Sequence, residues 1–139
     1  MPKPRRSARG LRLDQAIGCG VDVVELDRFR AAMRRGGRAF MARIFTAREE
    51  AYAAARKRTT LLHLAARFAA KEAVIKAIYQ ITPRTVPSMK QVEVCNDRLG
   101  RPRIVLHGAG RGRLEVHVSL SHVKSVAVAS ALAFGPNGG

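Results

Sequence analysis

The segment from about Thr60 to Tyr79 constrains the fold of this chain more than any other stretch. It has the spacing of a long helix that is apolar almost all round, and the sequence TPRTVP closes it. A helix with so little polar surface has to be covered by other elements, because its apolar side chains are stabilised only when they leave water. We therefore predict a long helix in the core of the protein.

One strand and two further helices are expected before this helix. Residues 17–24 alternate as in a half-buried strand, with the glycines and Asp22 on one face and an apolar set on the other, namely Ile17, Cys19, Val21 and Val23. A helix over residues 25–35 is expected to stop at the glycine pair 36–37. A second helix over 46–56 begins with Thr46 and Glu49 in the spacing of a capping box.

Four strands are expected after the long helix. They form two pairs, QVEV with PRIVLH and EVHVSLSH with SVAVASALAF, each joined by a short turn. The order of strand, helices and antiparallel strands predicts an α+β fold, in which an antiparallel sheet packs against the long core helix.

Length and composition are those of one domain. The 139 residues are 47% apolar, enough for one core, and we place the domain at 14–135, between a basic disordered tail at 1–13 and a flexible tail at 136–139. No stretch approaches the ~20 apolar residues of a membrane span, so we expect a cytoplasmic protein without a membrane partner. Cys19 and Cys95 lack CxxC spacing and are expected to be reduced packing residues.

The net charge of +16 predicts a negatively charged partner. Nucleic acid is one candidate, and a basic nucleic-acid-binding module without catalytic activity is the alternative function. Aromatic residues make up only 5% of the chain, tryptophan is absent, and no pattern typical of a nucleic-acid-binding motif stands out. An acidic protein or a polyphosphate ligand would be equally complementary to this positive charge.

Two carboxylates mark a candidate site. Glu72 emerges from an apolar side of the long helix, one turn before Lys76, and Asp22 shares its strand face with glycines. Each has a structural alternative: Glu72 and Lys76 could form a surface ion pair, and Asp22 could cap a helix, since DVVE is also a capping box. If Asp22 faces Glu72 across a gap lined by basic residues, the pair suits a divalent cation that holds phosphates.

The segment VHVSLSH supplies a third motif. Alternation places His122 on one strand face and Ser119 and Ser121 on the other. These residues could be ordinary strand and turn residues, or two hydroxyl groups and an imidazole that bind phosphate. No Gly-x-Ser-x-Gly elbow or obvious triad marks either serine as a nucleophile.

Together, GCGVDVVELDRF, RFAAKEAVIKAI and VHVSLSH resemble the holo-[acyl-carrier-protein] synthases, the small single-domain 4′-phosphopantetheinyl transferases. The resemblance runs from about Ile17 to Ala133 and includes RIFTAREEAYA and LGRPRI. It implies a 4′-phosphopantetheinyl transferase-like fold. It also implies transfer of the phosphopantetheine arm of coenzyme A to a serine of an acyl carrier protein, which leaves adenosine 3′,5′-bisphosphate.

The resemblance also implies roles for individual residues. The family's Mg²⁺ ligands match Asp22 and Glu72, and its lysine matches Lys76, which would neutralise phosphate charge as the leaving group departs. His122 matches a position associated with coenzyme A binding and catalysis; the other positions matched near coenzyme A are Arg67, Gly100, Pro102, Ser119 and Ser121. The base that takes the proton of the carrier serine stays open between a metal-bound water or hydroxide, Glu72 and His122.

Two expectations concern assembly. The first helix carries a cluster of arginines that we expect to dock the acidic carrier protein: Arg28, Arg30, Arg34 and Arg35. The strand SVAVASALAF has no strongly polar face, so something should cover both of its faces. Because half-length members of the resembled family are trimers, we expect a homotrimer packed through these sheets, with sites at subunit boundaries.

Overall fold

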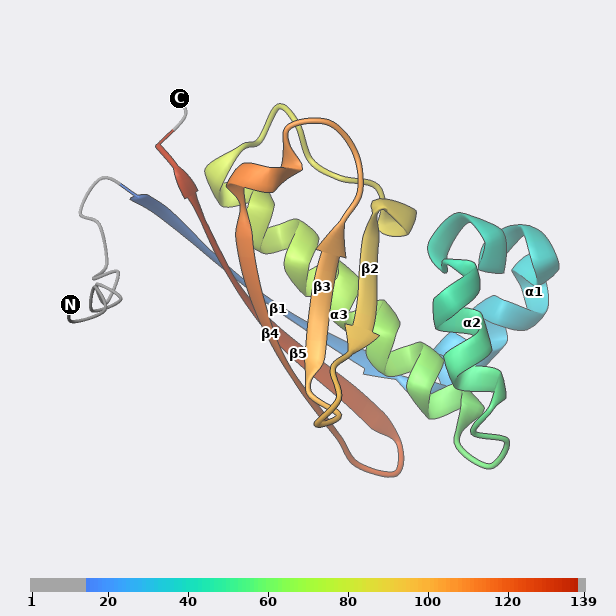
Figure 1. Ribbon diagram of the computed structural model, residues 1–139. Coiled ribbons are helices and arrows are strands. Elements are labelled where there is room, and N and C mark those ends of the chain that lie inside the picture. Colours follow the sequence, from blue (N-terminus) through green and yellow to red (C-terminus); the bar gives the residue numbers. More distant parts are fainter. Residues whose placement is uncertain (1–14, 138–139) are drawn as a thin grey trace.

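The computed structural model describes residues 15–137 and has the expected α+β fold (Figure 1). The predicted tail at 1–13 lies outside the described residues, as do residues 138–139. The elements are β1 (Gln15–Glu25), α1 (Leu26–Ile44), α2 (Ala47–Ala54), α3 (Thr60–Ile81), β2 (Val92–Asn96), β3 (Pro102–Leu106), β4 (Glu115–His122) and β5 (Val126–Pro136). Strand β5 therefore extends one residue into the predicted C-terminal tail.

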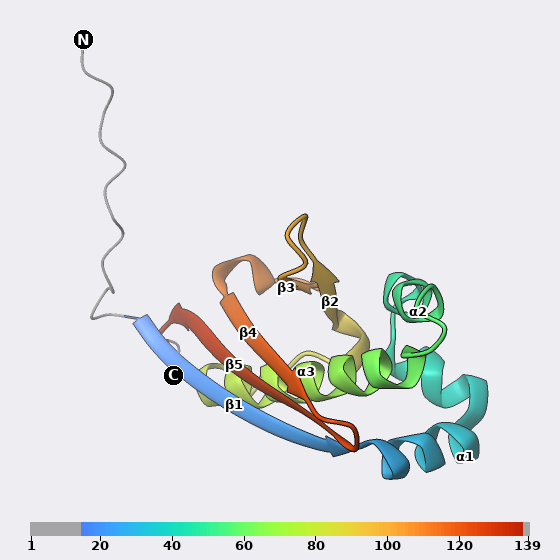
Figure 2. The same cartoon turned by 90° about the horizontal axis from the view of Figure 1, so that it is seen from below.

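The strands form two antiparallel sheets. One has three strands in the order β1-β5-β4, and the other is the hairpin of β2 and β3. The long helix α3 lies across one face of the three-stranded sheet, and the hairpin lies on the same side of that sheet (Figures 1 and 2). The predicted core helix is confirmed, since Ala69, Ala73 and Val74 are fully buried.

The outer face of the three-stranded sheet is exposed, and it carries the apolar set of β1. Its apolar side chains, rather than its glycines, face away from the core, with Val21 57% and Val23 61% exposed. Cys19 lies on the same face and is exposed, so it is not a packing residue within this chain. Leu132 of β5, paired with Cys19, is exposed too, and in the described part of the chain no element covers this face (Figure 2).

Helix α1 is longer than expected. The chain breaks its helical conformation at Gly37, where φ is 55° and ψ is −144°, and then resumes a helix to Ile44. A positive φ suits glycine because it has no Cβ, so the glycine pair introduces a kink instead of ending the helix. The capping box at the start of α2 is confirmed: the Glu49 backbone N–H donates to Thr46 Oγ1, and the Thr46 N–H donates to Glu49 Oε1.

Candidate active site

The two glycines of β1 determine how closely α3 approaches the sheet. A Cβ added at Gly18 would lie 1.9 Å from the carbonyl oxygen of Ala77, and one at Gly20 would lie 2.0 Å from that of Ala73. No side chain fits at these distances, so only glycine permits this packing. Asp22 lies two residues after Gly20, on the same strand face. It therefore reaches the side of α3 that carries Glu72.

Asp22 and Glu72 line one cleft of about 480 Å³. Arg28 and Phe29 of α1 line the same cleft, so β1, α1 and α3 all contribute to it. The alternative in which Asp22 caps a helix is wrong, because β1 continues to Glu25, which is itself the N-cap residue of α1. The predicted juxtaposition of the two carboxylates is thus present.

Glu72 is a partly buried carboxyl that lies near a second carboxylate. Burial, reinforced by the negative charge of Asp22, raises the pKa of Glu72, while Lys76 acts in the opposite direction. A bound divalent cation would offset both unfavourable effects, because carboxylate oxygens are hard ligands. The residues present therefore fit Mg²⁺.

Within residues 15–137, no group of three or more His, Cys, Asp and Glu side chains is arranged to bind a metal. Two protein carboxylates nevertheless suffice for Mg²⁺, which usually keeps several waters and takes further oxygens from phosphates. This cleft is therefore suited to a metal that binds together with a phosphorylated ligand.

Lys76 lies beside Asp22 rather than pairing with Glu72. Its Nζ donates to Asp22 Oδ1 at 3.1 Å and to the carbonyl oxygen of Val21 at 3.0 Å, and no ion pair joins it to Glu72 in the described part of the chain. The surface-pair alternative for Glu72 and Lys76 is therefore wrong. Lys76 is half-exposed, so its ammonium remains accessible to an anionic ligand next to the carboxylates.

The other predicted site residues gather around a second hollow of about 330 Å³ between α3, β4 and the β2–β3 turn. Of the positions predicted to bind coenzyme A, this hollow is lined by Arg67, Gly100, Pro102, Ser119 and His122. Ser121 does not line it, although Ser119 and Ser121 lie on the same strand face, paired with Ser130 and Val128. Five of six predicted positions thus share one site.

The two groups of predicted residues line different hollows. Asp22 and Glu72 lie in the first cleft, whereas His122 lies in the second. Within one chain, the structure therefore does not bring His122 into the same cavity as the carboxylate pair. A ligand that uses all of them has to extend from one hollow to the other or be completed by another subunit.

Three polar residues of the second hollow were not predicted from the sequence: Tyr52, His63 and Asn96. Burial lowers the pKa of His63, with additional effects from Arg67, Arg56 and His122, which favours an uncharged imidazole. Tyr52 and His63 pack edge to face, with ring centroids 5.4 Å apart. His63 and Asn96 lie outside the quoted motifs, and Tyr52 lies within RIFTAREEAYA without a ligand signal of its own, so spatial proximity was needed to find them.

The predicted docking arginines of α1 are all exposed. Arg30 forms an exposed ion pair with Asp27, with Nη1 and Oδ1 3.0 Å apart, and Arg28 also lines the carboxylate cleft. Positive charge therefore lies directly beside the predicted metal site.

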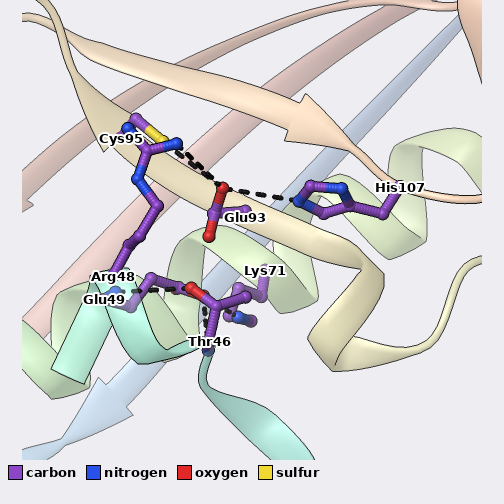
Figure 3. A network of polar contacts seen from close by, with 7 residues as sticks. All are labelled: Thr46, Arg48, Glu49, Lys71, Glu93, Cys95 and His107. Carbon is purple, nitrogen blue, oxygen red and sulfur yellow. Dashed lines mark hydrogen bonds and ion pairs between the residues drawn. The ribbon is translucent and has the colours of Figure 1, made fainter.

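A partly buried set of polar contacts connects α2, α3 and the β2–β3 hairpin (Figure 3). Lys71 is fully buried and donates to Glu49 Oε1 at 2.5 Å. The sequence did not distinguish Lys71 from the other basic residues near Glu72. Burial lowers the pKa of Lys71, and the Glu49 carboxylate opposes this shift. On the hairpin, Glu93 contacts Arg48 at 3.6 Å and His107 at 3.4 Å.

Comparison with known proteins identifies the group to which this arrangement belongs. A sequence model of the 4′-phosphopantetheinyl transferase superfamily matches residues 18–131. The chain belongs to this superfamily. The match covers β1, α3 and β4, which carry the three motifs.

Curated relatives and solved structures agree with this assignment. The chain is 42% identical to the holo-[acyl-carrier-protein] synthase of Moorella thermoacetica over 122 residues, which cover 84% of this chain and 92% of the relative. It is 38% identical to that of Ruminiclostridium cellulolyticum over 119 residues, covering 81% and 88%.

Two solved structures of the superfamily contain coenzyme A or part of it. One is the synthase–coenzyme A complex of Chronobacterium ammoniagenes, with a TM-score of 0.74, 32% identity, and coverage of 86% of this chain and 98% of that one. The other, from Bacillus anthracis, is described as a complex with coenzyme A (3′,5′-ADP) and has a TM-score of 0.70, 33% identity, and coverage of 86% and 99%. Family membership favours an enzyme over the nucleic-acid-binding alternative. Within residues 15–137, no helix has the length and apolar character that crossing a membrane requires.

Proposed function

We propose that this protein transfers the 4′-phosphopantetheine arm of coenzyme A to a serine of an acyl carrier protein. In this reaction the serine oxygen forms a bond to the β-phosphorus, and the bond to the departing adenosine 3′,5′-bisphosphate breaks. The observation that carries the proposal is the cleft that brings Asp22 and Glu72 together beside Lys76, in a chain of the superfamily whose solved relatives bind coenzyme A.

Each predicted residue has a role that its position supports. Asp22 and Glu72 would hold Mg²⁺, which when bound supplies positive charge for the diphosphate. Lys76, half-exposed next to Asp22, would neutralise charge on the leaving phosphate. Arg67 and His122 would bind the nucleotide end of coenzyme A in the second hollow.

Intact-mass spectrometry tests the proposal directly. An apo acyl carrier protein incubated with the enzyme, coenzyme A and Mg²⁺ is expected to gain the mass of one phosphopantetheinyl group. A carrier whose acceptor serine is replaced by alanine, and a reaction containing EDTA, should show no gain. An unmodified carrier, in conditions where the Moorella thermoacetica relative modifies it, would contradict the proposal.

The exposed arginines of α1 are proposed to dock the carrier. Reversing charge in the double variant Arg28→Glu/Arg34→Glu is expected to raise KM for the carrier by roughly tenfold or more, because like charges then face each other. KM for coenzyme A should change much less, and added salt should weaken wild-type docking.

Arg84→Glu is the matched control for docking, because Arg84 is exposed and follows the opposite end of α3 from α1 (Figure 1). Like the double variant, Arg84→Glu makes the net charge less positive. It should leave KM for the carrier near the wild-type value. If the α1 double variant affected both substrates equally, the docking assignment would be wrong.

The outer face of the three-stranded sheet is proposed to be the interface of a homotrimer. Val21, Val23 and Leu132 leave an apolar surface on this face, and Ser121 lies on the same side. Large exposed apolar surfaces are characteristic of association sites. A second subunit here would also allow His122 of one copy and the carboxylates of another to share a ligand.

Co-expression of two inactive variants tests the shared site. Glu72→Ala and His122→Ala subunits, with different affinity tags, are expected to form mixed trimers that regain roughly a quarter of wild-type activity on random assembly, because only some boundaries combine both intact residues. Each variant purified alone should stay inactive. Sedimentation of a fully active monomer at nanomolar concentration would refute the trimer, whereas a trimer without recovered activity would refute only the shared site.

A further inference from the structure

Four residues form a wall shared by two neighbouring hollows. One hollow is the 330 Å³ site that contains His122, and the other, of about 420 Å³, is lined by several arginines. The shared residues are Tyr52, Arg67, Asn96 and Gly100. They come from α2, α3, β2 and the turn after β2, so the shape of both hollows depends on how these segments are held together.

Arg67 is the charged centre of this wall. The residue is only 3% exposed, and burial lowers its pKa. Its Nη2 donates to Asn96 Oδ1 at 2.7 Å, while its Nε is buried and has no hydrogen-bond partner among residues 15–137. A buried guanidinium with an unused donor is costly unless a ligand completes its hydrogen bonds.

Tyr52 holds the guanidinium from the side of α2. The Arg67 Cζ atom lies 3.9 Å from the centre of the Tyr52 ring, and the Arg56 Cζ atom lies 3.4 Å from it. Arg56 also donates through Nη1 to the Tyr52 carbonyl oxygen at 2.9 Å. The negative faces of the ring attract both cations, so Tyr52 stabilises two arginines that would otherwise repel each other.

Asn96 holds the other end of the guanidinium. While its Oδ1 accepts from Arg67, its Nδ2 donates to the Gly100 carbonyl oxygen at 3.0 Å. Using both ends of the amide determines its orientation. Asn96 thereby connects the core helix to the turn at Gly100, whose φ of +79° requires glycine.

We infer that Tyr52 and Asn96 are positioning residues that aim the Arg67 guanidinium at the phosphate groups of coenzyme A. The inference rests on the proposed function, because that function supplies the anionic ligand. Arginine binds phosphate through a planar fork, so its orientation determines how many hydrogen bonds it forms. Tyr52 restrains the plane of the fork, and Asn96 restrains its direction.

Steady-state kinetics separates positioning from a structural role. Asn96→Leu and Tyr52→Leu are each expected to raise KM for coenzyme A by about tenfold, the effect of one charge-assisted hydrogen bond or stacking contact. The values of kcat and of KM for the carrier should stay within about twofold, since neither residue contacts the carboxylate cleft. Calorimetric binding of 3′,5′-ADP should weaken by the same factor.

A conservative variant and a double variant supply the controls. Tyr52→Phe keeps the ring that stacks on Arg67, so it should retain a KM for coenzyme A closer to that of the wild type. In an Arg67→Met background, adding Asn96→Leu should raise KM no further, because Asn96 acts through Arg67. Melting temperatures measured in parallel identify any variant whose fold is damaged.

Two outcomes would overturn the inference and are distinguishable. If the wild type modifies the carrier while Asn96→Leu and Tyr52→Leu retain the wild-type KM for coenzyme A, the positioning role is wrong and the proposed function stands. A wild type that transfers nothing to the carrier overturns the proposed function and this inference together. Fully additive effects of Asn96→Leu and Arg67→Met would also overturn the positioning role.

Discussion

Replacing Asp22 or Glu72 by alanine is expected to lower the rate of phosphopantetheine transfer by ~10²-fold or more, while the protein stays folded. Each substitution removes one carboxylate of the Asp22–Glu72 pair, so a divalent cation in the cleft loses one of its two predicted protein ligands. The measurement is the initial rate of carrier modification at saturating coenzyme A and varied Mg²⁺.

Asp27→Ala is the matched control for the carboxylate pair. Asp27 belongs to the first turn of α1, and its side chain is 91% exposed, so its removal should leave the transfer rate almost unchanged. Retention of full Mg²⁺-dependent activity by Asp22→Ala would show that the carboxylate pair does not hold the metal.

The isosteric variant Glu72→Gln adds a readout that needs no substrate. Because burial and Asp22 raise the pKa of Glu72, the folded protein binds this proton more tightly than the unfolded chain does. The Glu72 carboxyl therefore makes the protein less stable as the pH rises above the ordinary pKa of a glutamate side chain. In EDTA at pH 8, Glu72→Gln should melt at a higher temperature than the wild type, and the difference should vanish below about pH 4, where Glu72 is protonated in both states.

Breaking the buried pair is expected to have the largest effect on stability. Lys71→Met should lower the free energy of unfolding by about 3–5 kcal/mol, because it leaves the Glu49 carboxylate buried without its cation. The second oxygen of Glu49, Oε2, already lacks a hydrogen-bond partner in the described part of the chain. Urea unfolding at one fixed protein concentration measures the change, since any assembly makes stability depend on concentration.

Lys76→Met is the matched control for stability, and Glu49→Gln/Lys71→Met tests the cause. The Lys76 side chain is 52% exposed, so losing its pair with Asp22 should cost no more than about 1 kcal/mol. The double variant removes both charges and should recover much of the stability that Lys71→Met loses. If the double variant were as unstable as Lys71→Met, the loss would come from packing rather than from an unpaired charge.

Local patterns in the sequence determined the elements and much of the site. Apolar residues around the whole circumference of 60–79 predicted a core helix, and the structure extends it only to Ile81. The capping box of Thr46 and Glu49 predicted the start of α2, because both partners lie within one turn. The motifs also identified Asp22, Glu72 and Lys76, which the fold brings to one side of α3.

The tertiary structure decided which face of β1 is buried and which distant residues meet. Alternation shows that a strand has two faces, but it does not show which one lies inward, and here the glycine face packs because the Ala73 and Ala77 backbone comes so close. The pairs Glu49–Lys71 and Arg67–Asn96 join residues 22 and 29 positions apart. Such contacts depend on how helices and strands pack in three dimensions, and neither periodicity nor capping carries that information.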